Sequence, residues 1–119
     1  MIQSEEQLQA TFWKWAWNTH HIARRCMWAV PNSAIGIIVS RKDIIQAEKM
    51  KATGLLKGVW DLHLFWKGRF YIIETKFGSN GLSDDQKEWG DLMASHGAVR
   101  HIYRTLEEGV KIFESIILS

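Results

Sequence analysis

The sequence predicts a single α/β domain in which helices flank a mixed central sheet. Helix-capping patterns and short aliphatic or aromatic runs follow one another in the order helix, strand, helix, strand, strand, helix, strand, helix. The 119 residues suffice for one hydrophobic core but not for two, so residues 1–119 are expected to form one domain. A hydrophobic content of 46% and a charged content of 24% are ordinary for a globular protein.

The first helix is predicted by a capping-box pattern, Ser4 followed by Gln7. Trp13 and Trp17 point away from the predicted buried stripe of this helix, which favours packing or dimer contacts at that surface over platforms for base stacking. The stripe consists of the residues that recur at helical spacing: Leu8, Thr11, Phe12, Trp15, Thr19 and Ile22.

A short strand is predicted over residues 26–30, and a second helix over residues 41–53. Ser40 with Asp43 forms the capping box of that helix, and Gly54 is its C-terminal stop.

A hairpin is the next element, because Lys67-Gly68 is a two-residue turn signal between two aromatic and aliphatic runs. This turn pairs Trp66 with Arg69 and brings Asp61 directly opposite Glu74. Opposed side chains in an antiparallel pair lie about 4.5–5.5 Å apart at Cβ, and like charges there are destabilising. The two carboxylates therefore need a shared proton, a basic partner or a metal cation.

The remaining elements follow the same signals. A second capping box, Ser83 with Gln86, predicts a helix to about residue 96, and residues 99–103 form a strand. A third capping box begins at Thr105 and starts the last helix.

The hairpin also predicts a chemistry. Mg²⁺ and Mn²⁺ prefer hard oxygen ligands, which Asp61, Glu74 and the Thr75 backbone carbonyl would supply. Lys76 lies on the same face as Glu74. It could orient or deprotonate a water, or neutralise charge that develops on a phosphorane. Gln86 could hydrogen-bond this lysine, a water or a phosphate, or serve only as a member of its capping box. The residues alone leave a second interpretation open, in which each carboxylate pairs with a basic side chain such as Lys76 or Lys57 and no metal binds.

Composition narrows the location and the partners. No apolar run reaches the roughly 20 residues of a membrane span, and no signal segment opens the chain. The single cysteine, Cys26, excludes an internal disulfide and fits a reducing cytoplasm, bacterial or of a phage-infected host. The net charge of +2 says little, but the middle third is basic and could contact phosphates or form a solvated helix face. Its basic residues are Arg24, Arg25, Arg41, Lys42, Lys49, Lys51 and Lys57.

Three motifs together resemble the VRR-NUC nucleases, a branch of the PD-(D/E)XK superfamily with the restriction-endonuclease core. They are Lys57-Gly-Val-Trp-Asp61, Ile73-Glu-Thr-Lys76 and Leu82-Ser-Asp-Asp-Gln86-Lys-Glu-Trp89. Trp60 stands where the family usually has proline, a departure in the turn and not in a ligand. The resemblance runs from about Gly54 to Arg104 and extends less firmly to the first helix.

The resemblance implies a restriction-endonuclease-like fold and a divalent-metal-dependent endonuclease that hydrolyses DNA phosphodiester bonds with Mg²⁺ or Mn²⁺. It makes Asp61 and Glu74 metal ligands, Lys76 the catalytic lysine, Gln86 an auxiliary active-site residue and Glu5 a further acidic contributor. The helical geometry agrees on the last point. Glu5 lies about 60° from the centre of the buried stripe, whereas Glu6 lies about 160° from it.

Small stand-alone members of the family resemble compact homodimers that act on branched DNA such as four-way junctions, and larger relatives act on flaps. Contacts to DNA are expected from Arg41 and Lys42, from Lys57 unless it is only a flexible loop lysine, and from Asn32 unless that residue serves only a turn. Two alternatives from other classes remain: a DNA-structure-binding module with a degenerate site, and a dimeric scaffold with no affinity for branched DNA.

Overall fold

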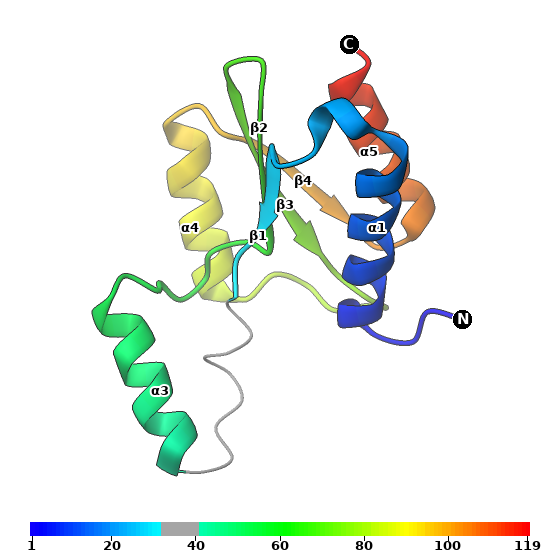
Figure 1. The fold of residues 1–119 in the computed structure, drawn as a ribbon. Coiled ribbons are helices and arrows are strands. Elements are labelled where there is room, and N and C mark those ends of the chain that lie inside the picture. Colours follow the sequence, from blue (N-terminus) through cyan, green and yellow to red (C-terminus); the bar gives the residue numbers. More distant parts are fainter. Residues whose placement is uncertain (32–40) are drawn as a thin grey trace.

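The computed structural model describes residues 1–31 and 41–119 and contains a mixed sheet between helices (Figure 1). A 3₁₀ turn, absent from the predicted order, follows the first helix. The elements are α1 (Glu5–Thr19), the 3₁₀ turn η1 (His21–Ala23), β1 (Met27–Ala29), α3 (Arg41–Ala52), β2 (Leu62–Trp66), β3 (Arg69–Thr75), α4 (Asp84–Ser95), β4 (Val99–Tyr103) and α5 (Leu106–Ile117).

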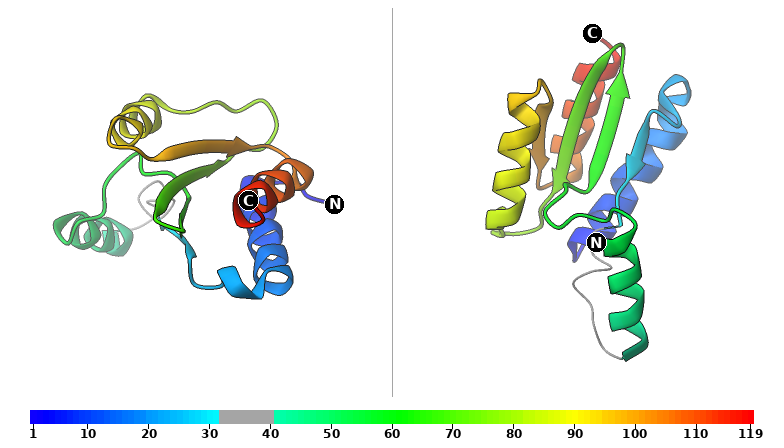
Figure 2. Two further views of the ribbon diagram at one scale, coloured as in Figure 1. Left: turned by 90° about the horizontal axis from the view of Figure 1, so that it is seen from above. Right: turned by 90° about the vertical axis from the view of Figure 1, so that its left-hand side faces the viewer.

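The four strands lie in the order β1-β2-β3-β4. The pairs β1–β2 and β2–β3 are antiparallel, and β3–β4 is parallel, with α4 as the crossover between the parallel strands. Helices α1 and α5 cover one face of the sheet and α4 covers the other (Figure 2). This arrangement confirms the predicted α/β class.

The hairpin has the register predicted from its turn. Trp66 pairs with Arg69, and the ladder continues to Leu62 opposite Ile73. Lys67 and Gly68 both have positive φ, 49° and 79°, as expected for the type I′ turn whose twist matches that of the strands. The same register carried one step further places Asp61 opposite Glu74.

The main core lies between the sheet and the α1–α5 pair. Phe12 of α1 is fully buried and packs against Tyr103 and Phe113, with ring centroids 4.7 and 6.0 Å away. The predicted stripe on α1 is correct for Leu8 and Phe12, while Trp15 is half-buried. It is wrong for the other members: Ala16 takes the inward position, Ile22 lies beyond the end of α1 at Thr19, and the Thr11 hydroxyl donates to the Gln7 carbonyl of its own helix. The exposed members of the predicted stripe are Thr11, Thr19 and Ile22.

Helix α4 packs closely on the other face because Gly90 admits the Trp60 ring. A Cβ at Gly90 would lie 2.7 Å from Trp60 Cζ2. The Trp60 indole Nε1 also donates to the Gln86 backbone carbonyl at 2.9 Å. These two contacts fix the N-terminal turn of α4 beside the end of β3, where the predicted site residues lie.

Helix α3 stands apart from the two helix layers (Figures 1 and 2). It begins at Arg41 as predicted and ends at Ala52, one residue before the predicted end, and Gly54 follows with a φ of 109°. The predicted cap Ser40 lies outside the described residues, as does Asn32. Within the described ranges, no helix is long and apolar enough to cross a membrane.

Candidate active site

Two acidic side chains meet where β2 and β3 begin to separate. The Asp61 backbone N–H donates to Glu74 Oε1 at 3.0 Å, and the Thr75 N–H donates to Asp61 Oδ2 at 3.2 Å. Glu74 is only 1% exposed, and Asp61 is half-buried. The hairpin register thus brings the predicted carboxylates together, each held by a backbone donor from the opposite strand.

Lys76 and Gln86 complete the cluster. Lys76 Nζ lies 3.3 Å from Glu74 Oε2 and donates to Gln86 Oε1 at 3.0 Å. Gln86 Nε2 donates to Glu74 Oε2 at 2.6 Å. Gln86 Oε1 also accepts from the Ser83 N–H at 2.9 Å, which closes the capping box of α4. One side chain therefore caps the helix and also hydrogen-bonds Lys76 and Glu74, so Gln86 is more than a capping-box residue.

The electrostatics of the pair leave negative charge only partly compensated. Burial raises the pKa of Glu74 to about 7, and the Asp61 charge adds to the rise, against opposing contributions from the Asp61 N–H and Lys76. Burial likewise raises the pKa of Asp61, and the Glu5 charge contributes, while the Thr75 N–H opposes the change. A cation between the two carboxylates would relieve both effects.

Glu5 faces the same site from the first turn of α1. Its Oε1 accepts a hydrogen bond from the Phe77 N–H at 3.4 Å. A cavity of about 380 Å³ is lined by Glu5, Asp61, Glu74 and Gln86. Glu6 does not line this cavity, although it lines a neighbouring one. The structure thus agrees with the angular argument that selected Glu5.

The predicted DNA-contacting residues are dispersed. Lys57 lines the cavity at its solvent side and lies 3.2 Å from Asp85, with both side chains well exposed, so the ion pair contributes little to stability. Arg41 and Lys42 are the first two residues of α3, the helix that stands apart from the two helix layers.

Sequence reasoning missed Gly58 and Tyr103 as supports of the site. Gly58 has a φ of +87°, and a Cβ there would lie 2.5 Å from the Asp85 carbonyl oxygen, so the loop before β2 fits closely against α4. A glycine beside Lys57 was the available signal. The Thr75 hydroxyl donates to the Tyr103 hydroxyl at 2.7 Å in the core and ties β3 to β4 under the site. A lone tyrosine on a strand gives no such signal.

In the described part of the chain, no three His, Cys, Asp or Glu side chains lie close enough to hold a metal ion by themselves. Any ion at this site would therefore take two carboxylates and complete its shell with backbone oxygen, water and substrate. Mg²⁺ commonly binds in this way.

Comparison with known proteins is informative at the level of the fold. No protein-family model matches the sequence, and no curated protein does. A solved structure of a VRR_NUC domain protein superposes with a TM-score of 0.70 over 99% of this chain and 91% of that chain, at 17% identity. The fold is similar to that of a VRR_NUC domain protein. The three sequence motifs predicted a resemblance to the VRR-NUC nucleases. The similarity in fold confirms this prediction at the level of the architecture.

Proposed function

We propose that the protein is a divalent-metal-dependent endonuclease that hydrolyses DNA phosphodiester bonds. The observation that carries the proposal is the cluster at the open end of the hairpin. There a buried Lys76 ammonium lies 3.3 Å from Glu74, and the Asp61 carboxylate lies opposite. The similarity in fold to a VRR_NUC domain protein supports the same assignment.

The residues at the site fit Mg²⁺ or Mn²⁺. Asp61 and Glu74 offer hard oxygen donors on opposed strands, and their raised pKa values reflect charge that a cation would neutralise. Asp61, Glu74 and the Thr75 backbone carbonyl would hold the ion. When bound, it would supply Lewis-acid activation of the phosphodiester.

The side chains of the chain itself perform three tasks. Lys76, only 7% exposed, presents a fixed positive charge toward oxygens of the phosphate as negative charge develops on them. Gln86 accepts from Lys76 and donates to Glu74, so it holds both in place before substrate arrives. Glu5 adds a third carboxylate at the cavity wall.

The substrate proposed is branched DNA, with four-way junctions as the first candidate and flaps as the second. A homodimer would place two active sites on opposed strands and double the surface that binds phosphates. Lys57 and the basic start of α3, Arg41 and Lys42, would contact the backbone, and Asn32 is a further candidate. The proposed location is the cytoplasm.

Cleavage of labelled four-way junction, flap and linear duplex in Mg²⁺, Mn²⁺ and EDTA tests the proposal. We expect the wild type to cut only with metal. We expect Lys76→Ala to cut about 10²–10³-fold more slowly, the usual cost of one preorganised donor to a transition state. Lys87→Ala, an exposed lysine on α4, is the matched control and should cut at the wild-type rate. Equal rates for wild type and Lys76→Ala, or no cutting of any substrate by the wild type, would contradict the proposal.

One observation favours a second candidate, a DNA-structure-binding module. Glu74 already accepts from the Asp61 N–H and from Gln86 and forms an ion pair with Lys76, so its carboxylate is satisfied by the protein itself. Such a module would shift junction DNA in a gel with Ca²⁺, and its wild type and Lys76→Ala forms would be equally inert in Mn²⁺.

A further inference from the structure

A second and larger cavity adjoins the proposed catalytic one. Its volume is about 640 Å³, within the usual range for cavities that bind small molecules. The two cavities share Glu5 and Asp61. From there the larger one extends along α1 to Trp13, so whatever occupies it lies next to the catalytic carboxylates.

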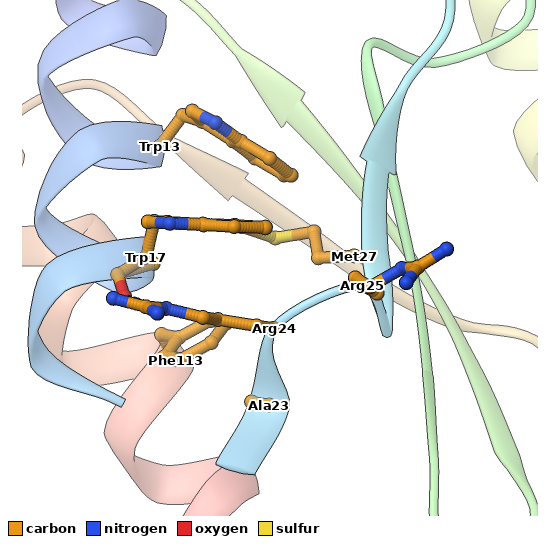
Figure 3. Close-up of a pocket in the computed structure, with 8 residues that line it drawn as sticks. Trp13, Trp17, Ala23, Arg24, Arg25, Met27 and Phe113 are labelled. Atoms are coloured by element: carbon orange, nitrogen blue, oxygen red, sulfur yellow. Dashed lines mark hydrogen bonds between the residues drawn. The ribbon is translucent and has the colours of Figure 1, made fainter. Parts of the chain in front are cut away.

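Planar groups lie one after another on one side of Trp13. Trp17, one helical turn later, lies 5.9 Å away between ring centroids, at an interplanar angle of 31°. The guanidinium of Arg24 lies 4.9 Å from the centroid of the Trp17 ring, and its Nε donates to the Trp17 carbonyl at 2.7 Å. Figure 3 shows Trp13, Trp17 and Arg24 as successive layers, and the other labelled side chains all lie on the Trp17 side of Trp13.

The lining of the cavity suits an uncharged planar group better than a phosphate. Apart from Trp13, the described lining consists of small, apolar or acidic side chains and Gln9, with no lysine or arginine among them. Glu5 and Glu6 would repel a phosphate. A nucleobase has no net charge and carries amino and imino donors that carboxylates and amides accept. Base stacking on an aromatic ring is tolerant of sequence because every base has a π face.

We propose that this cavity receives an unpaired nucleobase of the DNA substrate, stacked on Trp13, beside the phosphodiester bond that is cut. The inference rests on the proposed function and makes its substrate class more specific: DNA with an unpaired nucleotide at the cleavage position, as branch points provide. Trp17, which Arg24 holds through its ring and its carbonyl, backs the Trp13 ring and leaves the opposite face of Trp13 for the base. Arg24 and Arg25, on the Trp17 side of Trp13, would attract the flanking backbone.

Affinity measurements in Ca²⁺ test the proposal. They compare a branched DNA that has one unpaired thymidine with the same DNA in which an abasic nucleotide replaces that thymidine. We expect Trp13→Leu to bind the thymidine DNA about 5- to 150-fold more weakly than wild type, the range for one base–aromatic stack. Trp13→Phe should restore part of this loss. The abasic DNA should bind wild type and Trp13→Leu equally. Trp28→Leu is the matched control, because Trp28 is 42% exposed on β1 and does not line this cavity.

An equal loss of affinity for thymidine and abasic DNA would overturn the proposal, as would conversion of a dimer to a monomer by Trp13→Leu. The second result would make this face an interface between copies. Because Trp13 is half-buried against the core, a further measurement uses the wild type alone. A 2-aminopurine in place of the unpaired thymidine should lose fluorescence on binding, and unchanged fluorescence would also overturn the proposal.

Failure of this inference differs from failure of the proposed function. If the affinity depends on the base and on Trp13 but no DNA is cut in Mn²⁺, the proposed nuclease activity is wrong and the proposed base site stands. If DNA is cut in Mn²⁺ but the affinity does not depend on the base, the proposed base site is wrong and the proposed nuclease activity stands.

Discussion

Replacement of Glu74 by glutamine separates the stability of the site from its proposed chemistry. The pKa of Glu74 rises from its ordinary value of 4.5 to about 7 in the folded protein, chiefly through burial and then through Asp61. Between these two values the folded protein keeps a proton that the unfolded chain releases, so stability falls as pH rises. Below about 4.5 the loss is absent, and above about 7 it is complete. The difference between the two pKa values corresponds to a loss of about 3 kcal/mol in the free energy of unfolding.

Glutamine at position 74 has no charge to desolvate, so Glu74→Gln should lack this pH-dependent loss. The substitution also misplaces one hydrogen-bond acceptor, because Lys76 and Gln86 both donate to Glu74 Oε2, and this costs about 1 kcal/mol at every pH. The stability of the variant relative to wild type should therefore rise by about 3 kcal/mol from pH 4.5 to 8. At about 3–5 °C per kcal/mol for a domain of this size, that is roughly 10–15 °C in Tm.

The assay is thermal unfolding followed by circular dichroism in EDTA at several pH values. Burial lowers the pKa of His63 and of His101, which gives the opposite pH dependence. The difference between variant and wild type cancels these contributions. Glu88→Gln, at an exposed position on α4, is the isosteric control. A difference between Glu74→Gln and wild type that stays constant from pH 4.5 to 8 would refute the reasoning, because Glu74 would then not hold its proton in the fold.

Two further substitutions test how α4 is held. Gly90→Ala should destabilise the protein by about 1–3 kcal/mol, because its Cβ would lie 2.7 Å from Trp60 Cζ2. Gly81→Ala is the control, since no atom lies within 4 Å of a Cβ there, and equal Tm values for the two variants would contradict the prediction. Ser83→Ala removes the hydroxyl that accepts from the Gln86 N–H at 3.2 Å and should cost about 1 kcal/mol, or about 3–5 °C in Tm. DNA cleavage by Ser83→Ala should stay within a few-fold of wild type, whereas a large loss at unchanged Tm would give the hydroxyl a part in the chemistry.

The amino-acid sequence by itself determined the local structure of the site. The Lys67-Gly68 turn and the two-residue period of a strand fix which residues face each other, so the sequence alone pairs Asp61 with Glu74. The capping box at Ser83 located the start of α4 for the same reason, since its hydrogen bonds lie within one turn of helix.

Only the tertiary structure decided the burial of Glu74 and the surroundings of Trp13. The burial of Glu74 depends on how α4 lies across the sheet. The contact between Gly90 and Trp60, two residues far apart in sequence, sets that position. Trp13 was expected to point away from the core, yet it is half-buried at the end of a cavity that begins at Asp61. Helical periodicity gives the direction of a side chain from its own axis, but which atoms it meets there depends on the packing of other elements.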